Sequence, residues 1–202
     1  MKDELMNQRE PERVPEIAIV GDLTDHETDL SDKLLGVPLG GRCTLYFNSP
    51  GGSPYCAMSL LSLIAMRGLD ATGIVTGECS SAALWPFAAC KRRIVTAYSV
   101  LLFHPMKWQS DEHVGLAEAT EWARHFGELE VEMDQFLAQL LGISFERLSK
   151  WIQPGRYVSG REFVEAGLAE WVDPKTLTQF QDNGASRPGK KVKRRRQRAG
   201  SR

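Results

Sequence analysis

The sequence predicts an α/β protein built from repeated strand–helix–strand units. Short apolar segments alternate along the chain with segments of helical character. The apolar segments predict strands at 16–23, 44–47 and 69–76, and the segments that follow them predict helices at 29–35, 54–67 and 82–89. Alternation of this kind is typical of parallel strands joined by helical crossovers. A chain of 202 residues, of which 42% are hydrophobic, is long enough to bury one such core.

Polar or glycine-rich elements follow the ends of three predicted strands. Gly51 and Gly52 follow the 44–47 strand, Ser81 follows the 69–76 strand, and His104 directly follows an apolar strand at 100–103. In an open parallel sheet, ligands bind at the carboxyl ends of the strands, so these elements should converge on one crevice. Backbone amides, a serine and a histidine are the groups that acyl transfer requires.

Ser81 stands where the 69–76 strand passes into the 82–89 helix. The N–H group of Ala82 would then point to the place where an oxyanion forms. A serine pair in isolation is more often a helix cap, and only the glycine turn and the histidine favour the catalytic interpretation. Cys79 is an alternative nucleophile, although a role as a small packing residue is favoured.

The ordered motifs resemble those of the Clp peptidase family. The resemblance spans residues 16–173 and is carried by 46–53 with its Asn-Ser-Pro-Gly-Gly element, 77–83, 103–104, 157–162 and 167–173. It implies the ClpP/crotonase-like fold with a long handle helix, and a serine-type endopeptidase working inside a ring. By the same resemblance, Ser81 matches the nucleophile, His104 the general base, and the amides of Gly52 and Ala82 the oxyanion hole.

The sequence departs from the family pattern at two positions. The aspartate of the family's triad corresponds to Gly155, so the third triad member is unknown, with Asp134 or Glu132 as other acids that could supply the role. Pro54, at a substrate-contacting position, has no backbone N–H to offer a peptide. Two alternatives therefore stay open: a weak or inactive ring subunit, and an acyl-CoA enzyme of the crotonase fold. The Ser81/His104 pair gives no reason to prefer the second.

Residues 111–142 predict one long amphipathic helix, with Ser110 and Asp111 as caps. Its apolar residues recur at steps of four and three: Trp122, Phe126, Leu129, Met133, Phe136 and Leu140. About thirty residues at 1.5 Å each would reach roughly 45 Å, which is more than one domain needs to cover its sheet. The excess length favours a partner, and in the resembled family this helix stacks two rings. The alternative is a helix that lies across its own core.

Composition predicts three regions. Residues 1–14 read as a flexible polar head, 15–175 as the peptidase-like domain, and 176–202 as a polar linker with a basic, disordered tail. Eight lysines and arginines and no acid stand in 190–202, so the tail carries +8 and the rest of the chain −9. Such a tail either contacts nucleic acid or other polyanions or is simply solvated.

No targeting or membrane segment is predicted. No run of 18 apolar residues occurs, and the charged first 14 residues do not resemble a signal peptide, so we expect a soluble, cytoplasmic protein. The substrates implied by the resemblance are peptides or unfolded proteins. The peptidase reaction itself requires no cofactor, and any ATP requirement would belong to a separate ATPase unfoldase.

Cysteines and the remaining histidines lack the spacing of metal ligands. The cysteines are predicted to be small buried residues of a reducing compartment: Cys43, Cys56, Cys79 and Cys90. The histidines are predicted to lie on the surface or in helix packing: His26, His113 and His125. The sequence therefore predicts no metal site.

Overall fold

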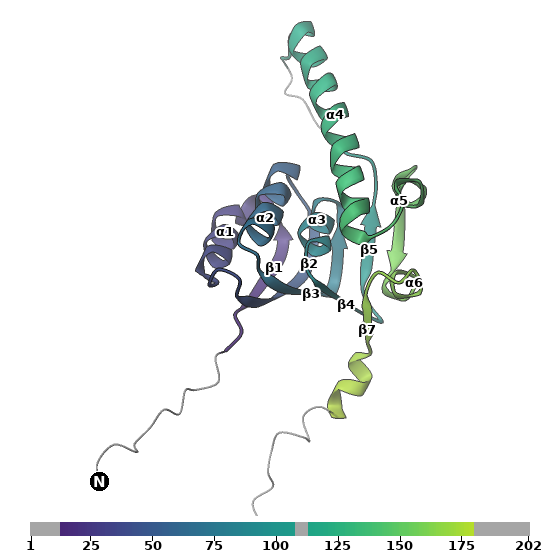
Figure 1. Cartoon of the computed structure of the whole chain (residues 1–202). Helices are drawn as coiled ribbons and strands as arrows, with labels where there is room; N and C mark the ends of the chain where they lie inside the picture. Colours follow the sequence, from purple (N-terminus) through teal and green to yellow (C-terminus); the bar gives the residue numbers. More distant parts are fainter. Residues whose placement is uncertain (1–12, 108–112, 180–202) are drawn as a thin grey trace, which may run out of the picture. The chain divides into compact units, whose positions relative to one another are not determined.

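The computed structural model describes residues 13–107 and 113–179 (Figure 1). The chain divides into two compact units, one ending at Val172 and one beginning at Asp173, and the second contains a 3-10 helix, η3 (Pro174–Gln179). The basic run 190–202 lies outside the described residues, as does the head except for residues 13 and 14. The predicted limits of the domain, head and tail stay predictions.

The first unit contains a seven-stranded sheet within its described residues. Its strands are β1 (Glu16–Asp22), β2 (Arg42–Gly51), β3 (Asp70–Ser80), β4 (Arg92–Thr96), β5 (Val100–Phe103), β6 (Arg156–Ser159) and β7 (Glu170–Val172). The path β1-β2-β3-β4-β7 is parallel throughout, and β5 pairs with β3 in parallel and with β6 in antiparallel. The predicted α/β class with parallel crossovers is confirmed.

Strand β3 divides its length between two neighbours. Residues 72–75 pair with β4, and residues 78–80 pair with β5, where Ser80 lies opposite Leu102. Because the pairing with β5 is parallel, the segments that follow β3 and β5 leave the same edge of the sheet. Ser81 and His104 therefore start from adjacent strand ends.

Helices connect the strands as predicted, with small shifts at their ends. They are α1 (Glu27–Gly36), α2 (Pro54–Met66), α3 (Leu84–Ala88), α4 (Leu116–Leu141), α5 (Phe145–Ile152) and α6 (Gly160–Glu165), with short 3-10 turns η1 (Thr24–His26) and η2 (Ser81–Ala83). Local chemistry explains two of the starts. The Ser53 hydroxyl accepts from the Tyr55 amide at α2, and Ser159 and Glu162 form a capping box at α6. Consecutive helices from α1 to α5 contact one another.

The core below the site is aromatic. Phe103, the last residue of β5, packs against Trp151 of α5 with ring centroids 5.1 Å apart, and also against Phe163. Phe47 of β2 meets Phe87 of α3 edge to face at 5.3 Å. These rings are nearly or fully buried and fix the backbone from which His104 leaves the sheet.

Helix α4 begins later than predicted. Residues 113–115 are not helical, and Gly115, with an extended backbone (ψ 151°), is the N-cap, so the start at 111 is wrong. Glycine has a low helix propensity, which places the boundary here. The predicted caps Ser110 and Asp111 lie outside the described residues. The end is as predicted: Gly142 takes a left-handed conformation (φ 71°), and the helix of 26 residues is about 39 Å long.

Only the C-terminal half of α4 packs fully into the core. Its buried residues are Met133, Leu137, Ala138 and Leu141. Of the predicted apolar face, Met133 is buried, whereas Leu129, Phe136 and Leu140 are partly buried against the core. The N-terminal half extends past the sheet (Figure 1). This arrangement does not fit the alternative prediction, a helix that simply lies across its own core.

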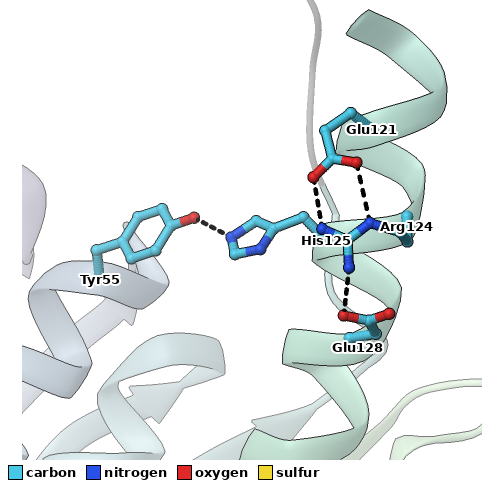
Figure 2. Close-up of polar contacts among 5 residues, drawn as sticks. All are labelled: Tyr55, Glu121, Arg124, His125 and Glu128. Atoms are coloured by element: carbon cyan, nitrogen blue, oxygen red, sulfur yellow. Dashed lines mark hydrogen bonds and ion pairs between the residues drawn. The ribbon is translucent and has the colours of Figure 1, made fainter. Parts of the chain in front are cut away.

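The projecting half of α4 is held by exposed polar contacts (Figure 2). The Tyr55 hydroxyl lies 2.8 Å from Nε2 of His125, with the two rings stacked at 6.4 Å. On α4 itself, Arg124 bridges Glu121 and Glu128. Such exposed pairs at helical spacing contribute little to stability, because solvent screens the charges. They therefore support α4 locally rather than anchor it.

The cysteines and histidines outside the site lie as predicted. All four cysteines are buried free thiols. His26, His113 and His125 are exposed. No helix in the described ranges combines the length and apolar character that a bilayer crossing needs.

Candidate active site

A cavity of about 190 Å³ opens where the ends of β2, β3 and β5 meet. Each site residue predicted from the sequence lines it: Gly52 after β2, Ser81 and Ala82 after β3, and His104 after β5. The rest of its lining is Pro54, Trp85, Met106, Lys107, Glu130 and Asp134. One small cavity thus brings together a hydroxyl, an imidazole and two backbone amides.

Ser81 has an unusual backbone conformation. Its φ is 52°, and it is the one non-glycine residue with a positive φ in the described part of the chain. Such a conformation costs about 1–3 kcal/mol and persists only where surrounding structure enforces it. Gly51 provides that surrounding: a Cβ there would lie 2.8 Å from Cβ of Ser81 and 2.9 Å from the Ala82 nitrogen. The turn after β3 is therefore a strained elbow pressed against the glycine turn after β2.

The Asn-Ser-Pro-Gly-Gly element forms the opposite wall. Oδ1 of Asn48 accepts from the Glu78 amide at 3.1 Å, which ties the end of β2 to β3. The Ser49 hydroxyl, fully buried, donates to the Gly21 carbonyl at 2.6 Å and accepts from the Gly51 amide at 3.1 Å. The polar residues of the motif thus hold the two glycines in place.

Gly52 is enclosed by the segment that follows β1. Its φ is +140°, and a Cβ there would overlap the Asp22 carboxylate and lie 2.9 Å from Oγ1 of Thr24. Two hydrogen bonds close the turn: the Leu23 amide donates to Gly51 O at 2.8 Å, and the Ser53 amide donates to Oγ1 of Thr24 at 2.9 Å. Only glycine fits this position.

His104 is oriented by its own backbone neighbour. Nδ1 lies 2.6 Å from the carbonyl oxygen of Pro105. A proton on Nδ1 would be donated to that carbonyl, which leaves Nε2 as a hydrogen-bond acceptor. This tautomer is the one that a general base needs.

Gly155 lies beside His104, where the resemblance expects the triad carboxylate. A Cβ on Gly155 would be 3.4 Å from Cβ of His104, but the φ of this residue is +123°. In the described residues no carboxylate hydrogen-bonds to the His104 ring, whose Nδ1 faces Pro105 instead. The position is right for the missing acid, and the backbone there suits glycine.

The other two acids named from the sequence differ in place. Glu132 is exposed and outside the cavity, whereas Asp134 is half-buried and lines it together with Glu130. Burial, and then the charge of Glu130, raises the pKa of Asp134 to about 7. Glu130 is fixed differently, because its Oε1 accepts from the Met106 amide at 2.7 Å.

The residues adjoining Ser81 are unsuited to attack a substrate. Cys79 is fully buried, burial raises the pKa of its thiol well above the usual range, and its Sγ donates to the Ala83 carbonyl at 3.4 Å. The predicted packing role of Cys79 is confirmed. The Ser80 hydroxyl is also buried, at 1% exposure, with no partner in the described residues. Ser81 is the hydroxyl that reaches the cavity.

The strain at Ser81 makes a testable prediction about stability. We expect Ser81→Gly to be more stable than Ser81→Ala by about 1 kcal/mol, because glycine adopts a positive φ without steric cost. Ser80 is the matched control, since its backbone is extended (φ −120°) and glycine there should be less stable than alanine. Denaturant unfolding of the four variants measures both differences. The same order at both positions would contradict a strained elbow.

Several lining residues were not predicted from the sequence. They are Trp85, Met106, Lys107 and Glu130. Glu130 and Asp134 stand four residues apart and therefore share one face of α4. The sequence contains this four-residue spacing, but α4 carries several other acids. Only the packing of α4 shows which pair faces the cavity.

Comparisons with known proteins agree with the fold. The family model described as Clp protease matches residues 40–175, about two-thirds of the chain. An ATP-dependent Clp protease proteolytic subunit of Oltmannsiellopsis viridis is 26% identical, over 73% of this chain and 80% of that protein. One of Chlorella vulgaris is 25% identical, over 72% and 76%.

A solved structure of a similar protein has the same fold. A ClpP1 mutant from Listeria monocytogenes superposes with a TM-score of 0.69 at 19% identity, covering 79% of this chain and 92% of that chain. The parallel sheet, the long α4 and the motif order all match the fold that the sequence predicted. The chain therefore belongs to the Clp protease family.

Proposed function

We propose that this protein is a serine peptidase that hydrolyses peptide bonds as the proteolytic subunit of a Clp-like assembly. The observation that carries the proposal is Ser81, held in a strained elbow and lining one cavity with His104, Gly52 and Ala82. Strained residues of this kind cluster at active sites. Besides the substrate and water, the proposed reaction requires only residues of this chain.

In this mechanism the Oγ of Ser81 attacks the carbonyl carbon of the scissile bond. His104 takes the hydroxyl proton on Nε2, which the contact between Nδ1 and Pro105 leaves free to accept it. The amides of Gly52 and Ala82 stabilise the oxyanion. His104 then returns the proton to the leaving amine, and water hydrolyses the resulting ester at Ser81 by the same route.

Covalent labelling tests the proposal. A fluorophosphonate should label the wild-type protein on Ser81, and Ser81→Ala should abolish labelling. Ser80→Ala and Cys79→Ala are matched controls, because both side chains are buried away from the cavity, and we expect both to label like the wild type. Peptide mapping of the adduct identifies the residue. An adduct on another residue would contradict the assignment of Ser81.

A second candidate is a ring subunit without catalytic activity. Gly155 favours it, because in the described residues no carboxylate hydrogen-bonds to the His104 ring, where it would stabilise the imidazolium. The same labelling experiment separates the two candidates. A folded, assembled protein that the fluorophosphonate does not label, and that cleaves no peptide, would support the second.

Ring assembly is part of the proposal. It is supported by α4, whose N-terminal half extends past the sheet and which exposes two apolar side chains, Leu116 (85% exposed) and Val131 (49% exposed). We expect light scattering at micromolar concentration to give a large multiple of the 22.6 kDa chain mass. A single 22.6 kDa species across ordinary salt concentrations would contradict it.

The proposed substrates are peptides or unfolded proteins supplied by an ATPase. The relatives are described as subunits of an ATP-dependent protease, which motivates this part of the proposal. Small peptides should then be cleaved at the same rate with or without ATP. An ATP requirement for small peptides in the isolated protein would contradict a separate ATPase.

A further inference from the structure

The cavity beside Ser81 has an acidic end that the proposed reaction does not use. Glu130 and Asp134, one turn apart on α4, line it together with Ser81 and His104. Neither carboxylate forms an ion pair within the described residues. Lys107 also lines the cavity, but it is exposed and pairs with neither. Within the described residues, the two carboxylates therefore have no ion-pair partner.

Asp134 is the less satisfied of the two acids. The amide of Met106 donates to Glu130, whereas no hydrogen bond to the Asp134 carboxylate occurs in the described part of the chain. Burial and the Glu130 charge raise its pKa to about 7, so ionisation of this group is opposed in the free protein. A bound cation would remove both penalties, because it replaces lost hydration and offsets the neighbouring charge.

The remaining walls suit a long aliphatic stem. Trp85 and Met106 contribute apolar side chains to the lining of the cavity. The indole is fixed, because its Nε1 donates to the Met133 carbonyl at 3.0 Å. Lysine and arginine side chains bury their methylene groups against apolar surface and keep the charge at a polar end.

The size of the cavity points to a single side chain. Pockets for small molecules have volumes of about 300–1,000 Å³. This cavity, at about 190 Å³, is smaller, and Ser81 forms part of its wall. Its occupant is therefore a substrate side chain adjacent to the bond that Ser81 would attack.

We propose that Asp134 and Glu130 form the base of a specificity pocket for the lysine or arginine side chain that precedes the scissile bond. This inference rests on the proposed peptidase function. An aspartate at the base of such a pocket selects basic residues in trypsin, on an unrelated fold. Asp134 is the principal determinant, because Glu130 already has a hydrogen-bond partner.

Hydrolysis of matched substrates is the first test. Fluorogenic peptides that differ only in lysine or norleucine before the cleaved amide share the stem and differ in the ammonium group. We expect the lysine substrate to be preferred about tenfold to a hundredfold in kcat/KM, and Asp134→Asn to remove the preference. Glu132→Gln is the matched control, since it makes a similar charge change on an exposed site of α4 outside the cavity. Equal rates for both substrates in the wild type would overturn the pocket and leave the peptidase function intact.

Binding is the second test and needs no turnover. In the Ser81→Ala protein, lysine and norleucine peptide amides are compared by chemical-shift titration, with and without Asp134→Asn. We expect tighter binding of the lysine peptide by about tenfold or more, lost in the double variant. This result without hydrolysis by the wild type would refute the proposed function and keep the cation pocket. Equal binding of the two peptides would overturn the pocket itself.

Discussion

His104→Ala is expected to lower kcat for a small ester or peptide by about 10²- to 10⁴-fold, the usual contribution of a positioned general base. The side chain lies at the end of β5 and lines the cavity with Ser81, and its Nδ1 is already engaged by Pro105. Loss of the imidazole removes the acceptor for the Ser81 proton and leaves the amides of Gly52 and Ala82 in place. Steady-state kinetics measures the change.

His125→Ala is the matched control for this variant. His125 is an exposed histidine on α4 that contacts Tyr55 and does not line the cavity (Figure 2). Its loss should leave kcat within about twofold. Turnover by His104→Ala equal to that of the wild type, in a folded protein of unchanged mass, would exclude His104 as the base.

Asp134→Asn is expected to stabilise the protein at pH 8 and to have little effect on stability at pH 4. Burial and the Glu130 charge raise the pKa of Asp134 to about 7 in the folded protein, against an unfolded value near 3.9. Between these values the folded state binds more protons than the unfolded state, so the free energy of unfolding falls as the pH rises and is level above pH 7. Asparagine has no such loss. Because Asp134 is only half-buried, we expect a gain of about 1–2 kcal/mol at pH 8.

Denaturant unfolding of both proteins at the two pH values measures this difference. Glu132→Gln again serves as the control, since Glu132 is an exposed carboxylate of α4 that does not line the cavity. A gain from Asp134→Asn that is equal at pH 4 and pH 8 would show that the charge of Asp134 is not the cause.

Most of the fold could be predicted because strand, turn and helix signals coincide. The apolar runs that became β1, β2 and β3, and the glycine turn after β2, each carry a local signal. Strands β4 and β6 carry no such local signal. β4 begins with Arg92 and Arg93, and β6 has three of its four side chains, Arg156, Tyr157 and Ser159, in solvent. Their strand conformation comes from pairing with β3, β7 and β5, which is tertiary information.

The candidate site, too, could be predicted only in part from the sequence. Ser81, His104, Gly52 and Ala82 stand at ends of strands, so the order of elements already predicted that they would meet. The positive φ of Ser81 depends on Gly51, and the contact of His104 with Pro105 depends on a side-chain rotation. No local sequence pattern predicts either the positive φ or this contact. The acidic end of the cavity depends on the direction in which α4 crosses α3, which sequence periodicity does not fix.

The bonds around Gly52 also bear on where a fragment of this chain that folds by itself should begin. The family model begins at residue 40, yet the turn after β2 is closed by residues 21–24. A fragment starting at residue 40 would leave β2 as an open sheet edge and remove the buried side chains of Ile19, Leu23 and Leu34 from the core. We therefore expect a fragment that folds on its own to begin before β1, some 25 residues before the start of the family model.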